Sequence, residues 1–330
     1  MRLGVLAGPD SDWKESLEKV RIAEDLGYEL VATGEAWGPS IIPWLSVLAS
    51  QTSTIQIGSS ILNTYSRTPA AIAQEFAMLE VLSGGRMVCG LGSSGIRVIE
   101  HFHGVEFNKP LRRIREYTEI FKLLMSGEKL HYDGEIFQME RGFRLDYDRV
   151  RTEVPVYIAA ITPKSIHQTG EIAEGIFPIH WPKQRFGVLR EQLAAGAELA
   201  GRSVDEITIA PFTNLYVLDG ESDESRWADA RQPLFHYINR MGDFYWQMLA
   251  STGFESEVLA SREAWGERDS EGAHAAITEE MVREIQVIGS EAEVREQLQE
   301  RSDLGAQLQM IQMPSGSVAE AGAKLEALIK

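Results

Sequence analysis

The stretch Gly58-Ser59-Ser60-Ile61-Leu62-Asn63-Thr64-Tyr65-Ser66-Arg67-Thr68-Pro69 joins an apolar, isoleucine-rich run to a helical pattern through small and polar residues. Residues 54–62 are typical of a buried strand because they contain Ile55, Ile57, Ile61 and Leu62. Thr68 followed by Pro69 predicts a helix start, since threonine caps helices and proline is favoured at the first helical position. The stretch therefore predicts a strand, a polar loop and a helix in succession.

The same alternation of apolar run and helical pattern recurs along the chain. The predicted strands are residues 3–7, 30–33, 55–62, 87–91, 156–160, 176–179, 207–218 and 308–313. Eight strands that alternate with helices predict an α/β fold of the (β/α)8 TIM-barrel type. We expect one domain over residues 1–330, with insertions at about 127–153, where Asp133-Gly134 predicts a hairpin, and at 219–277, a largely helical segment in a position to form a lid.

Composition limits the function classes. The chain has 49 acidic and 32 basic residues, a net charge of −17, which argues against binding to nucleic acid or to an anionic membrane surface. Its apolar runs are too short for a membrane span or a signal peptide. The single cysteine, Cys89, cannot form a disulfide within the chain. We therefore expect a cytoplasmic protein that acts on a small molecule.

A glycine-rich motif follows the predicted strand at 87–91. Gly90-Leu91-Gly92-Ser93-Ser94-Gly95 has the G-x-G-x-x-G spacing of dinucleotide-binding folds. In those folds the glycines open a helix directly, and an acidic residue ends the next strand. Here the next clear helix begins only at Pro110, and no strand follows at that spacing. The dinucleotide interpretation is therefore rejected.

A second loop has the chemistry of an anion site. Residues 156–160 are followed by Thr162, a candidate cap, by Pro163 and then by Lys164. The N-terminus of a helix presents free N–H groups and a partial positive charge, to which Lys164 adds a full charge. Taken alone, the pattern favours a plain capped helix over an anion site.

Together these motifs resemble the bacterial luciferase-like flavin and deazaflavin oxidoreductases, especially the branch that uses coenzyme F420 (8-hydroxy-5-deazaflavin) and includes the methylene-tetrahydromethanopterin reductases. The resemblance covers residues 1 to about 210 and resumes near residue 288. It implies a luciferase-like TIM barrel and a non-proline cis peptide at Ser60-Ile61 that presses on the central ring of the cofactor. It also implies that the cofactor phosphate lies at residues 161–165.

The resemblance further implies site residues. Those implied to bind the cofactor are Glu35, Ser60, Ile61, Asn63, Ser93, Ser94, Ala160, Ile161, Thr162, Lys164 and Ser165. Glu35 and His103 are implied to be catalytic. Trp37, His180 and Lys183 are expected to face the substrate. No metal site is expected, because His101 and His103 lack a third ligand at a recognisable spacing.

The sequence departs from the family at two positions. Related deazaflavin dehydrogenases have a histidine after the acid at Glu35, where this chain has Ala36. An acidic residue after the fourth strand is also missing, because Gly95 occupies its place. These departures argue against the mechanism of the sugar-phosphate dehydrogenases of this family.

The predicted activity is an F420-dependent hydride transfer between C5 of the deazaflavin and a small organic substrate. The alternatives are an FMN-dependent monooxygenase, for which the same barrel serves, and a catalytically silent flavin-binding or scaffold protein, which Ala36 favours. A homodimer is expected, because residues 41–48 and 70–77 carry more small and apolar side chains than one core-facing stripe requires.

Overall fold

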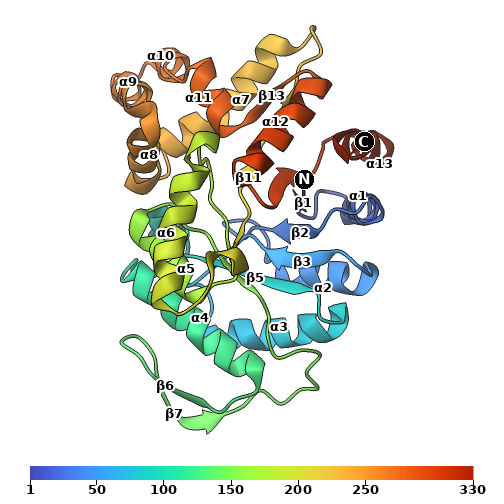
Figure 1. Ribbon diagram of the computed structural model, residues 1–330, viewed down its shortest axis with the longest axis vertical. Helices are drawn as coiled ribbons and strands as arrows, with labels where there is room; N and C mark the ends of the chain where they lie inside the picture. Colours follow the sequence, from blue (N-terminus) through green and yellow to red (C-terminus); the bar gives the residue numbers. More distant parts are fainter. Residues whose placement is uncertain (330) are drawn as a thin grey trace.

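A curled sheet of parallel strands lies at the centre of the computed structural model, which describes residues 1–329 (Figure 1). The barrel strands are β1 (Leu3–Leu6), β2 (Leu30–Thr33), β3 (Gln56–Ser59), β4 (Leu62–Asn63), β5 (Met87–Gly92), β8 (Val156–Ile158), β9 (Gly175–Ile176), β10 (Thr208–Ile209), β11 (Phe212–Thr213) and β14 (Gln309–Gln312). Neighbours follow the order β10-β9-β8-β5-β3-β2-β1-β14-β11, and β4 pairs with β5.

The barrel closes through the segment that contains β10 and β11. The Ala210 N–H donates to the Ile176 carbonyl at 2.9 Å on one side, and the Met310 N–H donates to the Pro211 carbonyl at 2.9 Å on the other. Pro211 has no N–H to donate, and the ladder is interrupted at this residue. The predicted fold class is therefore confirmed.

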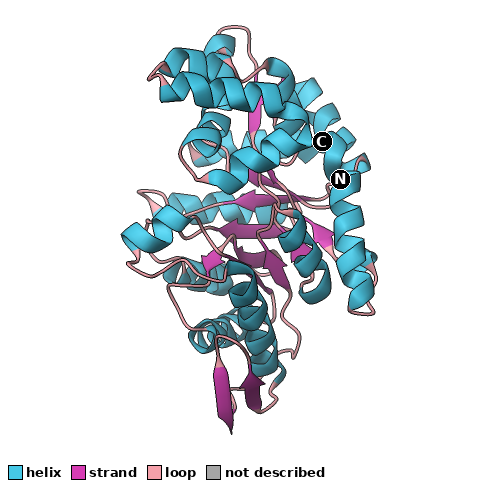
Figure 2. Cartoon of the chain, turned by 90° about the vertical axis from the view of Figure 1, so that its left-hand side faces the viewer, coloured by secondary structure: helices cyan, strands magenta, loops and turns pink. Residues whose placement is uncertain are grey.

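A helix follows each strand position and covers the outside of the barrel (Figure 2). These helices are α1 (Trp13–Asp25), α2 (Ile42–Gln51), α3 (Pro69–Ser83), α4 (Pro110–Ser126), α5 (Pro163–Ile172), α6 (Phe186–Leu199), α12 (Glu291–Asp303) and α13 (Val318–Ile329). The α3 helix begins as its sequence predicts: the Thr68 hydroxyl caps the Ala71 N–H at 3.1 Å. It ends where Gly84 takes a left-handed conformation with φ 68°.

Two segments project from opposite ends of the barrel in Figure 1. One is the hairpin of β6 (Leu130–Asp133) and β7 (Gln138–Phe143), whose turn is closed by the Gly134 N–H and the Phe137 carbonyl. The other contains the helices α7 (Asp223–Asn239), α8 (Asp243–Leu249), α9 (Glu255–Gly266), α10 (Ser270–Ala275) and α11 (Glu279–Ile285).

Two details differ from the predicted strands. The run 207–218 is not one strand, because its last part, β12 (Leu215–Val217), leaves the barrel and pairs in parallel with β13 (Val287–Gly289). The strand β13 was not predicted from the sequence. The run 55–62 is also divided, into β3 and β4, at the Ser60-Ile61 bulge.

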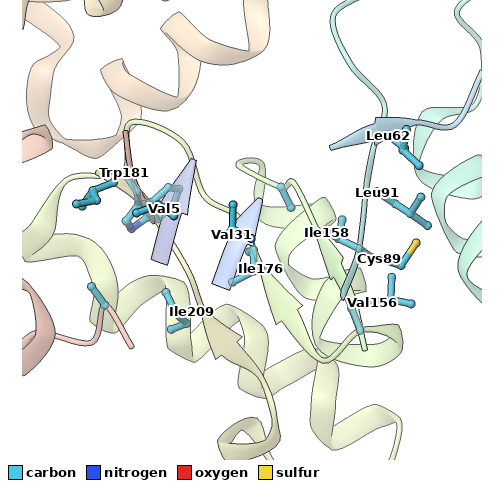
Figure 3. Close-up of a cluster of buried hydrophobic side chains, with 14 of the residues drawn as sticks. Val5, Val31, Leu62, Cys89, Leu91, Val156, Ile158, Ile176, Trp181 and Ile209 are labelled. Atoms are coloured by element: carbon cyan, nitrogen blue, oxygen red, sulfur yellow. The ribbon is translucent and has the colours of Figure 1, made fainter. Parts of the chain in front are cut away.

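Alternating residues of the strands pack on two sides of the barrel wall. Figure 3 shows side chains from the outer surface, including Val5, Val31, Ile158 and Ile176, which belong to the core between strands and helices. A second cluster fills the barrel interior and contains Leu30, Ala32, Val88, Tyr157, Phe177, Ala210, Leu308 and Met310. The barrel is thus a packed core, and its chemistry lies at the mouth formed by the strand ends.

Candidate functional site

The bulge at Ser60-Ile61 lies at the carboxyl ends of three neighbouring strands. Its peptide bond is cis, as the resemblance implied. The Ser60 N–H donates to the Thr33 carbonyl at 2.7 Å, and the Ile61 carbonyl accepts the Glu35 N–H at 3.2 Å. The bulge is therefore fixed to the end of β2, and the partly exposed Ile61 side chain stands at the barrel mouth.

Small residues make room for Ile61. A Cβ added to Gly92 would lie 3.0 Å from Ile61 Cγ1 and Cδ1 and 3.2 Å from the Ala159 Cβ. Ile61, Gly92 and Ala159 are thus in contact across β4, β5 and the end of β8. Gly90 serves a different purpose, because a Cβ there would meet the Ser59 carbonyl oxygen at 1.8 Å. The first two glycines of the rejected dinucleotide motif are therefore required for close packing.

Ile61, Gly92 and Ala159 are called the platform below. Asn63, two residues after Ile61, carries an unused hydrogen-bond donor. Its side-chain oxygen accepts the N–H groups of Tyr65 at 3.0 Å and Ser66 at 2.8 Å. The residue is 1% exposed, and its Nδ2 has no hydrogen-bond partner. The neighbouring Thr64 hydroxyl, also buried, lacks a partner as well. Buried donors are nearly always satisfied in folded proteins, so Asn63 and Thr64 are available to a bound molecule.

Glu35, the predicted catalytic acid, is engaged in an ion pair. Both of its oxygens bond to the Arg67 guanidinium, and one also accepts the Ile41 N–H at 3.0 Å. Burial would raise the pKa of Glu35, but the bonds from Arg67 and Ile41 outweigh it and lower that pKa. Glu35 is therefore held ionised, which favours a positioning role over proton donation.

The predicted phosphate site coincides with the N-terminus of α5. Thr162 and Ser165 cap each other reciprocally: the Ser165 N–H donates to the Thr162 hydroxyl at 3.3 Å, and the Thr162 N–H donates to the Ser165 hydroxyl at 3.0 Å. Ile161 is partly buried and Ala160 is buried at the foot of this turn. Lys164 is exposed and forms no ion pair with any residue between 1 and 329. Its charge is free for an anion.

The two candidate histidines lie in different surroundings. His103 follows the short π-helix Val98–Phe102 after β5, and its Nε2 is buried without a partner. His180 follows β9 and is 4% exposed, also with an unpartnered Nε2. Burial, followed by repulsion from His236, lowers the pKa of His180 to about 3. His180 is therefore neutral at physiological pH.

The remaining predicted site residues are Trp37, Ser93, Ser94 and Lys183. The Trp37 indole is 61% exposed in the loop after β2. Ser93 and Ser94 lie at the end of β5, where the Ser93 hydroxyl donates to the Ser94 carbonyl at 3.2 Å. The Lys183 ammonium pairs with Glu300 of α12 at 2.6 Å. That Lys183 faces the substrate stays a prediction, and in this structure its charge is already compensated by Glu300.

Several residues at the mouth were not anticipated from the sequence. Arg67 lies within the stretch that decides the fold, and its pairing with Glu35 was not predicted, although an arginine at a strand end is a usable signal. Tyr237 and Tyr245 come from the helical insertion, where no motif marks them. The Tyr237 ring meets the His180 ring edge to face at 4.5 Å.

Other features of the described chain carry no comparable chemistry. A cavity of about 710 Å³ lies at the opposite, amino-terminal end of the barrel, next to Val154 and Pro155, which precede β8. Its cations, Arg115, Lys122 and Arg202, are already paired with carboxylates. Residues 1–329 contain no group of three or more His, Cys, Asp or Glu side chains placed to hold a metal ion. None of the helices in this range is both long and apolar enough to cross a bilayer.

Comparison with known proteins identifies relatives over nearly the whole chain. The 5,10-methylenetetrahydromethanopterin reductase of Archaeoglobus fulgidus is 30% identical over 311 residues, which cover 92% of this chain and 91% of that protein. The F420-dependent glucose-6-phosphate dehydrogenase of Microbacterium testaceum is 31% identical over 201 residues, 56% of this chain and 59% of that protein.

The fold is shared as well. The solved structure of the coenzyme F420-dependent tetrahydromethanopterin reductase from Methanopyrus kandleri superposes with a TM-score of 0.83 at 23% identity, and covers 100% of this chain and 97% of that chain. The model of the luciferase-like monooxygenase family matches residues 1–308. The chain therefore belongs to the luciferase-like monooxygenase family.

Proposed function

We propose that this protein is an F420-dependent oxidoreductase that transfers a hydride between C5 of the deazaflavin and a small organic substrate. The relatives at 30% and 31% identity are a methylenetetrahydromethanopterin reductase and an F420-dependent dehydrogenase. The observation that carries the proposal is the platform of Ile61, Gly92 and Ala159 at the barrel mouth, together with the unpartnered Nδ2 of Asn63. A flat ring with polar edges fits these residues.

The residues present fit such a cofactor. Ile61 would support one face of the ring, and the small residues Gly92 and Ala159 make room for the Ile61 side chain. Asn63 Nδ2 and the Thr64 hydroxyl would bond to polar atoms at the ring edge, and Ser93 and Ser94 would line the adjacent strand end. When bound, coenzyme F420 supplies or accepts a hydride at C5.

The phosphate of the cofactor would bind at the N-terminus of α5. The capping pair Thr162 and Ser165 fixes the turn, and the helix end presents N–H groups with a partial positive charge. Lys164 adds the full charge that an acidic protein needs at the site of an anionic ligand. Ala160 and Ile161 would form the apolar side of this turn.

The ion pair of Glu35 and Arg67 would orient the mouth without exchanging a proton. It links the loop after β2 to the loop after β4, and Glu35 also holds the bulge through its N–H. Since enzymes of this kind depend mainly on orienting cofactor and substrate, the rigidity of this link is its contribution. His103 and His180, each with a free Nε2, are the remaining groups that can bond to a substrate.

Titration of the purified apoprotein with F420 and with FMN tests the proposal. Selective binding of F420, followed by turnover with reduced F420 over a panel of substrates, supports it. Selective binding of FMN with oxygen uptake would support a monooxygenase instead. Binding of F420 without turnover over a broad panel would favour a flavin-binding protein without catalysis.

We further propose a cytoplasmic homodimer. Three large apolar side chains of α3 are exposed: Met78 at 55%, Val81 at 42% and Leu82 at 37%. They lie on a helix whose other side is buried against the barrel, so α3 is apolar on more than one face. The only cysteine, Cys89, is a buried free thiol, which is compatible with a reducing compartment.

A further inference from the structure

We infer that Tyr237, Tyr245 and His180 form the substrate-binding wall of the barrel mouth, and that this wall selects an uncharged substrate with a hydrogen-bonding oxygen on an alicyclic or aromatic body. The inference rests on the proposed function. It assigns Tyr237 and Tyr245, which lie in the helical insertion, to the site at the barrel mouth where the cofactor is proposed to bind.

The backbone of His180 is held in an unusual conformation. Its φ is 53°, a left-handed value that few residues other than glycine adopt. The residue is nevertheless buried, with an exposed fraction of 4%, and its Nε2 has no hydrogen-bond partner. Residues held in such conformations cluster at binding sites, and a buried unpartnered nitrogen is rare elsewhere. Both observations point to a ligand at His180.

The insertion places two phenol rings beside this histidine. The ring of Tyr237, near the end of α7, meets His180 at 4.5 Å, and the ring of Tyr245 in α8 meets Tyr237 at 4.7 Å. Both contacts are edge to face, so the three rings form a continuous surface. Neither phenol hydroxyl bonds to a described residue, whereas those of Tyr28 and Tyr65 bond to backbone carbonyls.

The same segment reaches across to the cofactor side of the mouth. Between α7 and α8, the Arg240 carbonyl accepts a bond from Arg97 at 3.3 Å. A Cβ on Gly95, just beyond Ser94, would lie 3.7 Å from the Met241 Cε. The segment 237–245 therefore contacts both His180, which follows β9, and the residues that follow Ser94 after β5.

The chemistry of this wall defines the substrate class. Aromatic faces favour an apolar ring, and the phenol hydroxyls and the imidazole can each bond to one oxygen. The wall carries no charge at neutral pH, because burial lowers the pKa of His180 and raises that of both phenols. A charged group placed against these three rings would lose water without gaining a counter-ion.

Ligand-observed NMR titrations test the inference with two matched probes. One probe is cyclohexanone, and the other is the same ring with a carboxylate opposite the carbonyl. Each is titrated into protein loaded with oxidised F420. We expect cyclohexanone to bind at least about tenfold more tightly than the carboxylate, because the three rings of the wall offer the latter no counter-ion. Equal or tighter binding of the carboxylate, or no binding of cyclohexanone, would overturn the assignment of substrate class.

Hydroxyl-deleting variants test the residues. Tyr237→Phe and Tyr245→Phe keep the rings, and each should weaken cyclohexanone binding about 3- to 10-fold, the effect of one lost hydrogen bond. His180→Asn should also weaken it, since asparagine tolerates the left-handed backbone but lacks the ring. Tyr147→Phe is the control, because among residues 1–329 the Tyr147 hydroxyl bonds only to the Met125 sulfur. This variant should bind cyclohexanone with the affinity of the parent.

Separate titration with F420 keeps the two proposals distinguishable. All four variants should bind F420 with parental affinity, because the wall faces the substrate. Parental cyclohexanone affinity in Tyr237→Phe, Tyr245→Phe and His180→Asn would refute the wall even if F420 binds. In another outcome, the parent fails to bind F420 while cyclohexanone binding to the apoprotein still weakens in the tyrosine variants. That result would refute the proposed cofactor and retain the substrate wall.

Discussion

The carboxylate of Glu35 accepts hydrogen bonds from both terminal nitrogens of the Arg67 guanidinium. The two residues thereby join the loops that follow β2 and β4. The Glu35 side chain is 8% exposed and that of Arg67 is 16% exposed. Charge-assisted bonds at this depth are among the stronger polar contacts of a protein. The pair therefore fixes one side of the barrel mouth before any ligand binds.

Replacing Glu35 with glutamine should lower the free energy of unfolding by about 2 kcal/mol, because Arg67 loses its main partner. It should also weaken F420 binding, since the loop after β2 is no longer fixed. Urea unfolding and F420 titration measure the two effects. Glu75→Gln is the matched control: Glu75 also pairs with Arg67, at 3.2 Å, but is 29% exposed and should cost less. An equal loss in both variants would contradict the special role of Glu35.

The same variant should change the pH dependence of stability. Because its partners lower the pKa of Glu35 in the folded protein, the ionised carboxylate stabilises the fold above the pKa of the unfolded chain. That contribution disappears as the pH falls through the folded-state pKa. Below about pH 5 the stability difference between the parent and Glu35→Gln should therefore shrink. A constant difference from neutral to acid pH would show that the ion pair is not its source.

Two neighbouring glycines should respond differently to alanine. In Gly90→Ala the new Cβ would meet the Ser59 carbonyl oxygen at 1.8 Å, so the backbone of two barrel strands must separate and folding should fail. In Gly92→Ala the new Cβ meets only side chains, at 3.0 Å and beyond, so the protein should fold with Ile61 displaced. Circular dichroism and F420 titration check these outcomes: Gly92→Ala should be folded and bind F420 more weakly. Parental affinity in that variant would remove Ile61 from the cofactor site.

Lys164→Ala should weaken F420 binding by about tenfold, because one charge-assisted bond to the phosphate is lost. Stability should hardly change, since Lys164 is exposed. Lys129→Ala is the matched control: Lys129 is an exposed lysine next to the β6–β7 hairpin, outside the proposed site, so F420 affinity should not respond. Unchanged F420 affinity in Lys164→Ala at moderate salt would place the phosphate elsewhere.

The double variant Met78→Lys, Leu82→Lys should be a monomer, because two charges on the exposed apolar side of α3 cannot be buried in an interface. Light scattering at micromolar concentration measures the mass. Leu199→Lys is the control: Leu199 is 74% exposed at the end of α6, on another part of the surface. A parental protein that is itself a monomer would refute the proposed dimer.

The barrel and part of the mouth could be predicted from the sequence because their signals are local. The cap at Thr162 lies within a short motif. The cis bulge at Ser60-Ile61 was expected from the family resemblance, and the packing role of Gly90 and Gly92 became visible only in the folded contacts. The departure of β12 from the barrel could not be predicted, since residues 207–218 read as one apolar run, whereas only its last part, Leu215–Val217, pairs with β13, about 70 positions later. The partners of Lys183 and Glu35 were missed because they depend on how neighbouring elements pack. Tyr237 and Tyr245 have no sequence motif, since their meaning arises only when the insertion is folded over His180.

The short parallel pair of β12 and β13 brings the two ends of the helical insertion together, with Leu215 opposite Val287 and Val217 opposite Gly289. A segment whose ends meet in this way can change in length or content without moving the strands from which it starts. The two tyrosines of the substrate wall are therefore encoded apart from the cofactor platform, while His180 stays with the barrel. Grafting a different segment between these two strands would offer a route to new substrates on an unchanged redox scaffold.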